Sequence, residues 1–203
     1  MIRNVVFDMG GVLIRYDFSK YCTRYAPDPD DHALIMDELF GSVEWVQLDR
    51  GAIEQAQAIR SISARLPARL HGAVGQILNN WHEGAAPIDG MDALIRRLRA
   101  AGYGVYLLSN AAKTIHAYAP RLPGYDCFNG LFFSADCHLL KPEIAIYRAF
   151  CDEFHLDAGE CVFIDDLSLN VEGAIHAGMH GLVFRGDAAR LERELTARGV
   201  RLP

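Results

Sequence analysis

The sequence predicts a doubly wound α/β fold, in which helices cover both faces of a parallel sheet and a small helical domain is inserted. Two alternating patterns predict this fold. Short, continuous apolar runs bounded by Gly, Asp, Asn or Ser are typical of strands buried on both faces of a parallel sheet, and segments with apolar residues at helical spacing separate them. The predicted strands are residues 4–7, 103–108, 130–133, 161–164 and 181–184.

The segments between the later strands carry apolar residues at i, i+3 and i+4, which predicts amphipathic helices. Two of these helices stop at Gly102 and Gly178, and glycine commonly follows a helix end. The helical sets are Met91, Leu94, Ile95 and Leu98, then Tyr147, Phe150, Cys151 and Phe154, then Val171, Ala174 and Ile175.

The stretch from 17 to 85 breaks this alternation. Its apolar residues recur at helical spacing, and no strand-like run interrupts them. We therefore expect residues 17–85 to form a helical cap, inserted after the first strand and covering the site. Residues 1–16 and 86–203 would then form the core domain.

Composition limits the classes of function. The 203 residues, 51% of them apolar, are enough for a core domain with a small appendage. The net charge of −6, without a Lys/Arg-rich run, argues against nucleic-acid binding. The five cysteines include no C-x-x-C pair, which indicates reduced thiols. Without a signal peptide or an apolar stretch of ~20 residues, we expect a cytoplasmic protein with no membrane contact, and the oligomeric state stays open.

Polar side chains follow the predicted strands at the point where each strand ends. Asp8 follows the first strand, Ser109 and Asn110 follow the second, and an acidic pair at 165–166 follows the fourth. Lys141 lies a little beyond the third. Ligands of an open parallel sheet bind beyond the carboxyl ends of its strands, so we expect these side chains to meet at one edge.

This set of side chains suits phosphoryl chemistry. Clustered carboxylates at neutral pH need a cation, and a few hard oxygen ligands suit Mg²⁺, with water and a substrate phosphate completing its coordination. Lys141 would neutralise Asp8 and the transferring phosphoryl group. Backbone N–H groups of Ser109 and Asn110 would donate to phosphate oxygens. Asp8 would be a carboxylate nucleophile that forms an aspartyl phosphate.

Each residue taken alone also has a purely structural interpretation. Asp8 could be a turn residue before two glycines, and the acidic pair at 165–166 could, with Ser168, cap the next helix. Lys141 could be a solvated lysine where a helix starts at Pro142. Their shared placement beyond strand ends favours a site.

Four segments occur in an order that resembles a known family. They are VVFDMGGVL, VYLLSNA, LLKPEIAIY and VFIDDLSLNVEGA, and they span roughly residues 4 to 184. This order resembles the motifs of the haloacid dehalogenase-like hydrolase superfamily, whose members are mostly Mg²⁺-dependent phosphatases. The resemblance implies these roles: Asp8 as nucleophile and metal ligand, Ser109 as phosphoryl binder, Lys141 as charge stabiliser, Asp165 and Asp166 as metal ligands, and Gly10 as metal ligand through its carbonyl oxygen.

Position 10 departs from the family's pattern. The usual phosphatases of the family carry there a second aspartate, which protonates the leaving oxygen and later activates water, whereas this chain has Gly10. General acid–base help of this kind is typically worth ~10²–10⁴-fold in rate. We therefore expect a good leaving group, as in an anomeric sugar phosphate or an acyl phosphate, or a proton supplied by water, the substrate or a cap residue.

Residues expected to choose the substrate lie in and near the insert. The segment WVQLDRGAI resembles the cap segment of relatives in this family. Trp45, Asp49 and Arg50 are therefore candidates for substrate contact, against the alternative that they only cover or pack the cap. Arg15 and Asp17, which lead from the first motif into the insert, are further candidates.

The leading interpretation is a Mg²⁺-dependent phosphatase of a small phosphorylated metabolite, such as a sugar phosphate, that acts through Asp8. A phosphate-binding or regulatory protein with weakened catalysis is the alternative, because the second aspartate is missing. A 2-haloacid dehalogenase is disfavoured by the acidic pair at 165–166, which such relatives replace with small polar residues. A phosphomutase is disfavoured because Gly10 removes the usual proton shuttle.

Overall fold

A five-stranded parallel sheet forms the centre of the core. A computed structural model of the chain describes residues 1–202, and in it the strand order is β5-β4-β1-β6-β7. The strands predicted from the sequence agree with the observed ones to within one residue at each end. The strands are β1 (Asn4–Phe7), β4 (Gly104–Ser109), β5 (Gly130–Phe133), β6 (Cys161–Asp165) and β7 (His180–Val183).

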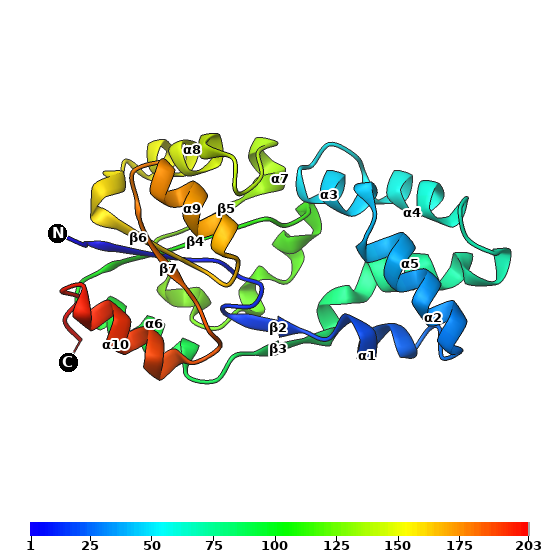
Figure 1. The fold of residues 1–203 in the computed structure, drawn as a ribbon, viewed down its shortest axis with the longest axis horizontal. Coiled ribbons are helices and arrows are strands. Elements are labelled where there is room, and N and C mark those ends of the chain that lie inside the picture. Colours follow the sequence, from blue (N-terminus) through cyan, green and yellow to red (C-terminus); the bar gives the residue numbers. More distant parts are fainter. Residues whose placement is uncertain (203) are drawn as a thin grey trace.

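Helices cover both faces of this sheet, as the doubly wound fold requires. They are α6 (Met91–Ala100), α7 (Ser134–Cys137), α8 (Ile144–Phe154), α9 (Ser168–His176) and α10 (Ala188–Ala197). Figure 1 shows α8 and α9 above the sheet and α6 and α10 below it. Val5 and Phe7 pack in the cluster that includes α6 and α10, whereas Val6 packs in the cluster that includes α8. Successive side chains of a strand point to opposite faces, so a strand covered on both sides is apolar at every position.

Residues 18–84 form a second, helical half, at the right of Figure 1. It has a buried cluster of its own, in which Ile35, Leu39, Ile62 and Ile77 have no exposed surface. Its α-helices are α1 (Phe18–Thr23), α2 (Pro29–Ile35), α3 (Val43–Asp49), α4 (Gln55–Ser63) and α5 (His71–Asn80). A π-helical stretch, Met36–Phe40, continues α2, and a 3-10 turn, Ala68–Leu70, leads into α5.

Two short strands join the halves, and the sequence patterns did not reveal them. Strand β2 (Ile14–Tyr16) pairs antiparallel with β3 (Ala85–Pro87), with Arg15 opposite Ala86. Three residues are too few to show an alternating pattern, and Pro87 is unusual within a strand. The chain therefore enters and leaves the helical half through two adjacent segments.

Two further expectations concern the chain as a whole. All five cysteines are free thiols, and three of them, Cys22, Cys151 and Cys161, are buried, which agrees with the predicted reduced thiols. Within residues 1–202, no helix is both long and apolar enough to cross a membrane.

Candidate active site

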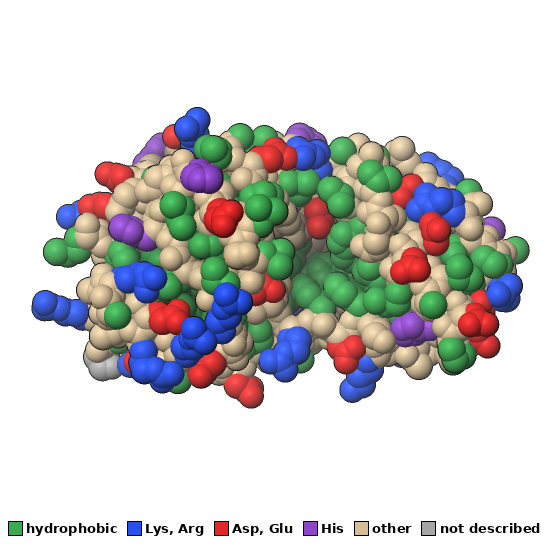
Figure 2. All heavy atoms as spheres, viewed as in Figure 1, with side chains coloured by type: hydrophobic (Ala, Val, Ile, Leu, Met, Phe, Trp, Pro, Cys, Tyr) green, Lys and Arg blue, Asp and Glu red, His purple; other side chains and the backbone are tan. Residues whose placement is uncertain are grey.

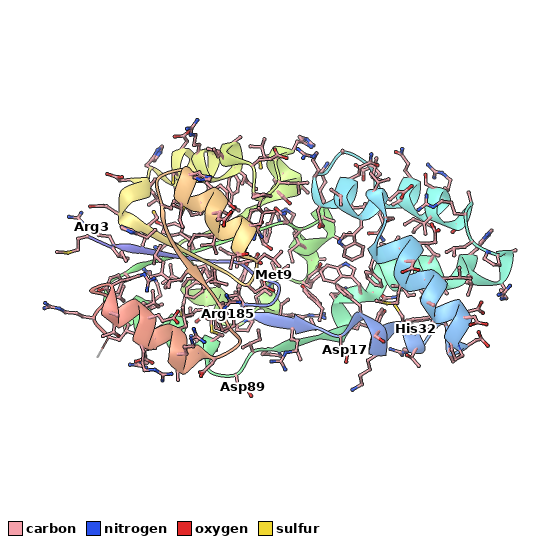
Figure 3. All side chains as sticks on the ribbon, in the orientation of Figure 1. Arg3, Met9, Asp17, His32, Asp89 and Arg185 are labelled. Carbon is pink, nitrogen blue, oxygen red and sulfur yellow. The ribbon has the colours of Figure 1, made fainter. Side chains whose placement is uncertain are left out.

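The carboxyl ends of three neighbouring strands bring the predicted polar residues together. Asp8 follows β1, Ser109 ends β4 and Asp165 ends β6, and β1 lies between the other two strands. The backbone N–H of Asp8 donates to the carbonyl oxygen of Ile164 at 2.8 Å, so the hydrogen bonds between β1 and β6 continue as far as the aspartate. Met9, labelled in Figure 3, marks this edge, where the sheet meets the helical half.

Lys141 is buried between two of the carboxylates. Its Nζ atom lies 2.7 Å from Oδ1 of Asp8 and 2.7 Å from Oδ2 of Asp165, and its side chain is 2% exposed. Burial by itself would lower the pKa of Lys141, but the two carboxylates outweigh it and the pKa is raised. Lys141 is therefore a fixed positive charge and not a solvated lysine at a helix start, and α8 begins only at Ile144.

The carboxylates lie close enough together to hold a cation. Burial, the strongest influence, raises the pKa of Asp8 to about 6, and Asp165 adds to the rise while Lys141 opposes it. The charge of Lys141 therefore offsets the effect of burial on the Asp8 carboxyl only in part. Each of three aspartates, Asp8, Asp165 and Asp166, offers one carboxylate oxygen. These three oxygens lie within 4.8 Å of one another. Hard oxygen donors at this spacing fit Mg²⁺.

Two glycines shape the loop after Asp8. Gly11 has a φ of +71°, and a Cβ there would lie 2.3 Å from Oδ2 of Asp166, so a side chain would displace that carboxylate. A Cβ at Gly10 would meet only the Tyr16 ring, at 3.5 Å, which is an ordinary contact. No backbone N–H in residues 1–202 donates to the Gly10 carbonyl oxygen, which leaves that oxygen available for the predicted metal contact.

Asn170, which the sequence reasoning missed, fixes Asp165 in place. Its Nδ2 donates to both oxygens of Asp165, at 3.1 and 3.0 Å, and the backbone N–H of Leu167 donates to Oδ1 at 2.8 Å. The Tyr147 hydroxyl, from α8, donates to the Asn170 carbonyl oxygen at 2.6 Å. The only sequence signal for this role is the place of Asn170 in the first turn of the helix after the acidic pair.

The two polar residues after β4 have different placements. Ser109 is 1% exposed, and within residues 1–202 its hydroxyl makes only one long contact, a donation to the Asn110 carbonyl oxygen at 3.4 Å. The Asn110 side chain is paired with the backbone of Lys141, because Nδ2 donates to its carbonyl oxygen at 3.1 Å and Oδ1 accepts from its N–H at 2.9 Å. The Asn110 amide therefore positions Lys141, a role that the predicted phosphate contact did not include.

A cavity of about 520 Å³ opens beside these residues, and Asp8, Ser109 and Lys141 line it. Figure 2 shows the hollow between the two halves, with hydrophobic side chains inside it. Tyr16 also lines the cavity, and its hydroxyl is buried with no hydrogen-bond partner among the described residues. Buried hydroxyls are normally hydrogen-bonded, so this one indicates a place for a ligand or water.

Asp49, the last residue of α3, lines the same cavity from the helical half. Burial raises its pKa to about 7, and the charge of Asp8 adds to the rise, whereas the Ala112 backbone N–H and the charge of Lys141 oppose it. A carboxyl group that exchanges a proton near neutral pH therefore faces the cavity that Asp8 also faces.

The match to a protein family covers this whole arrangement. The family model for haloacid dehalogenase-like hydrolases matches residues 2–178, which include all four of the segments singled out in the sequence. The chain is a haloacid dehalogenase-like hydrolase. The predicted family and the predicted fold class are both confirmed.

Curated proteins similar to this hydrolase include a phosphatase and a flavin mononucleotide hydrolase. The sesquiterpene phosphatase astK of Aspergillus oryzae is 28% identical over 184 residues, which cover 89% of this chain and 88% of that protein. Flavin mononucleotide hydrolase 1 of Arabidopsis thaliana is 23% identical over 196 residues, which cover 97% of this chain and 77% of that protein.

Solved structures of the family share the fold of this hydrolase. A family enzyme from Bacteroides thetaiotaomicron, in complex with magnesium and inorganic phosphate, has a TM-score of 0.73 at 22% identity and covers 94% of this chain and 99% of its own. A family hydrolase from Porphyromonas gingivalis has a TM-score of 0.75 at 24% identity, with 96% and 98% covered. The family assignment and the magnesium in the first structure agree with magnesium as the cofactor expected from the sequence.

The five candidates for substrate contact in this hydrolase separate into two groups. Arg15, Trp45 and Asp49 line the cavity, whereas Asp17 and Arg50 lie outside its lining. The three that line it come from both sides of the junction between the halves, since Arg15 lies in β2 and the other two lie in α3.

Asp17 and Arg50 make structural contacts instead. Asp17 caps α1, because its Oδ1 accepts from the Lys20 N–H at 2.9 Å, and Figure 3 shows it at the lower edge of the molecule. The Arg50 guanidinium pairs with Glu143 and donates to the His138 carbonyl oxygen at 3.2 Å. Both partners of Arg50 belong to the half of the molecule that contains the five-stranded sheet. This arginine therefore holds the end of α3 against that half.

Proposed function

We propose that this hydrolase is a magnesium-dependent phosphatase that releases phosphate from a small phosphorylated metabolite through a phosphoryl group carried on Asp8. The observation that carries the proposal is the cluster of Asp8, Asp165 and Asp166 at one sheet edge, with Lys141 paired to the first two. The two similar curated proteins, named as a sesquiterpene phosphatase and a flavin mononucleotide hydrolase, support this activity class.

The residues that would hold the metal are the three clustered aspartates and the Gly10 carbonyl oxygen. Asp8, Asp165 and Asp166 supply carboxylate oxygens at a suitable spacing, and the donor set is the hard-oxygen type that Mg²⁺ prefers. When bound, the ion supplies positive charge that keeps these carboxylates ionised and neutralises phosphate oxygens. Lys141 supplies a second, permanent positive charge beside Asp8.

The first step transfers the phosphoryl group to Asp8. A carboxylate oxygen of Asp8 forms a bond to phosphorus, while the bond from phosphorus to the ester oxygen breaks and its electron pair leaves with that oxygen. Lys141 stabilises the negative charge beside the nucleophile, and the weakly engaged Ser109 hydroxyl donates to a phosphoryl oxygen. In the second step, water attacks the same phosphorus and releases Asp8 and inorganic phosphate.

Asp49 transfers the proton in place of the aspartate that is missing at position 10. It shares the cavity with Asp8, and with a pKa of about 7 both of its forms are present near neutral pH. Protonated Asp49 donates to the leaving ester oxygen in the first step, and the resulting carboxylate accepts a proton from the attacking water in the second. Each turnover returns Asp49 to its starting form.

Residues 17–85 act as the cap of this site, and residues 1–16 and 86–203 act as the core domain. The two parts connect through the adjacent strands β2 and β3, which is the geometry of a hinge. The ion pair of Arg50 with Glu143 holds the cap against the core in the arrangement described here. Closure of such a cap excludes water from the reacting groups.

Hydrolysis of p-nitrophenyl phosphate tests the proposed function, because its phenolate leaving group needs little help from an acid. We expect Mg²⁺-dependent hydrolysis by the wild type and a loss of about 10³-fold or more in Asp8→Asn. Asp17→Asn is the matched control, since it makes the same chemical change at a helix-capping position outside the cavity, and asparagine also caps helices. Equal rates for Asp8→Asn and the control would overturn the proposal.

Gly10 favours one second candidate, a phosphate-binding or regulatory protein with weakened catalysis. Its signature would be calorimetric binding of Mg²⁺ and phosphate without turnover of any ester, including an anomeric sugar phosphate and an acyl phosphate. Release of halide from a 2-haloacid without metal would instead indicate a dehalogenase.

A further inference from the structure

We propose that the phosphate ester hydrolysed by this protein carries an apolar organic group, a hydrocarbon chain or an aromatic ring, that binds against aromatic side chains in the cavity. This inference rests on the proposed phosphatase function and adds the class of substrate. The surface concerned, called here the aromatic wall, consists of Tyr16, Phe18, Trp45 and Trp81, all of which line the cavity.

The four rings form one continuous surface. Tyr16 and Phe18 are stacked, with ring centroids 5.3 Å apart and planes inclined by 4°. Trp81 lies 5.0 Å from Tyr16, Trp45 lies 5.8 Å from Phe18, and the two indoles are 6.2 Å apart. These separations are typical of favourable aromatic pairs. The wall is therefore held in shape by its own contacts before any ligand binds.

The wall differs from ordinary core packing in its exposure to the cavity. Trp81 is buried, but Tyr16, Phe18 and Trp45 are only partly buried, and all three line the cavity. Apolar surface that faces a cavity gains favourable free energy when an apolar ligand covers it. A volume of about 520 Å³ lies in the range of pockets that bind small organic molecules.

The wall begins where the family's second aspartate is missing. A Cβ at Gly10 would lie 3.5 Å from a carbon of the Tyr16 ring, so the ring lies next to the loop that carries Asp8. An ester whose phosphorus lies at Asp8 therefore extends its organic group past Gly10 onto the wall. Glycine at this position leaves apolar room directly beside the phosphate.

The same surface is unfavourable for a sugar. Sugar hydroxyl groups turned toward the carbon faces of these rings lose their hydrogen bonds to water, and the wall offers them few partners, the unpaired Tyr16 hydroxyl among them. Gln55, a polar residue of the lining, already donates to Asn79. The sugar phosphate expected from the sequence is therefore not the substrate class that this lining favours.

The test uses phosphate monoesters of primary alcohols, because a common type of leaving oxygen keeps the chemical step alike while the organic group changes. Ethyl, butyl and hexyl phosphate are compared with glucose 6-phosphate in the presence of Mg²⁺. We expect kcat/KM to rise about fourfold for each methylene group that the wall covers and to be lower for glucose 6-phosphate than for hexyl phosphate. A flat alkyl series, or a preference for glucose 6-phosphate, would overturn the proposal.

Substitutions in α3 test whether the dependence of kcat/KM on alkyl chain length comes from the aromatic wall. Trp45→Ala should lower the ratio of kcat/KM for hexyl over ethyl phosphate by about tenfold, and Trp45→Phe, which keeps a ring, should restore most of it. Val46→Ala is the matched control, because Val46 is the next residue of α3, is 50% exposed and lies outside the lining. A ratio in Trp45→Ala equal to that of the wild type would contradict the proposal.

Alkyl phosphonates separate this inference from the phosphatase function, because their carbon–phosphorus bond is not hydrolysed. Calorimetry in Mg²⁺ compares ethylphosphonate with hexylphosphonate. Tighter binding of the hexyl compound, with a more negative heat-capacity change, supports binding of the apolar group to the aromatic wall even if no ester is turned over. Equal affinities for the two phosphonates would overturn the inference whatever the turnover assays show.

Discussion

The ammonium group of Lys141 lies 2.7 Å from Oδ1 of Asp8, and both side chains are buried at the carboxyl edge of the sheet. The same ammonium group is equally close to Asp165. Two ionised carboxylates against one ammonium leave a net negative charge in a place with little water, and Asp166 adds to it. Burial, more than this imbalance, keeps the pKa of Asp8 raised despite its lysine partner. The excess of negative charge explains why the site suits a divalent cation.

Lys141→Met should destabilise the protein strongly when no metal is present. The apolar side chain leaves Asp8 and Asp165 buried without their shared cation, and breaking a buried ion pair in this way costs about 3–5 kcal/mol. Urea unfolding measures the loss, and saturating Mg²⁺ should recover part of it. Lys113→Met, at a lysine whose side chain is 53% exposed, is the control and should change little. A metal-free Lys141→Met protein as stable as the control would contradict this account.

Asp49→Asn should change the pH dependence of hydrolysis. The donating form of Asp49 is protonated, and its pKa is about 7, so wild-type kcat for ethyl phosphate should fall as the pH rises above 7. The variant cannot donate a proton from this position, so its rate should be lower by ~10²–10⁴-fold and should lack that alkaline decline. The loss should be smaller for p-nitrophenyl phosphate. If kcat of the variant fell above pH 7 as it does in the wild type, another group would be the proton donor.

Gly10→Asp should raise the turnover of esters with poor leaving groups more than that of aryl esters. The backbone there has room, because a Cβ at Gly10 meets only the Tyr16 ring at an ordinary distance, and a second carboxyl group would add general acid help. The comparison of kcat for ethyl and p-nitrophenyl phosphate measures the effect. An equal fall in both rates would mean that the glycine is needed for room.

Gly11→Ala should weaken Mg²⁺ binding. Its φ of +71° disfavours alanine, and the new Cβ would lie 2.3 Å from Oδ2 of Asp166, which must then move. Gly186→Ala is the matched control, because Gly186 also has a positive φ, +78°, but a Cβ there meets no atom within 4 Å. Both variants should lose similar stability, while calorimetry should find weaker Mg²⁺ binding only in Gly11→Ala. Equal Mg²⁺ affinities would contradict the role given to Gly11.

The sheet and its acidic edge could be predicted because each depends on a local pattern. Strand β1 is apolar from Val5 to Phe7, where both of its faces are buried, and Asp8 follows it directly. Parallel pairing then brings the carboxyl ends of β1, β4 and β6 to one edge of the sheet, independently of the conformation of the loops between them. The burial of Lys141 follows from the two carboxylates that it meets there.

Contacts between distant segments could not be predicted in the same way. The Asn110 amide bonds to the backbone of Lys141 across 31 positions, and Arg50 pairs with Glu143 across 93. Nothing in the sequence near either residue indicates its partner. The sequence therefore predicts a phosphate contact for Asn110 and leaves Arg50 a candidate either for substrate contact or for covering or packing the cap. The aromatic wall was missed for the same reason, since Tyr16 and Trp81 are far apart in the sequence and meet beside the pairing of β2 with β3.

The phosphoryl group on Asp8 is the central claim, and rapid acid quenching during turnover of p-nitrophenyl phosphate, followed by mass spectrometry of peptides, tests it most directly. We expect a phosphoryl group on the wild-type peptide that contains Asp8, present with Mg²⁺ and ester and absent from Asp8→Asn. A phosphoryl group on another residue, or an Asp8→Asn protein that turns over the ester at the wild-type rate, would contradict it.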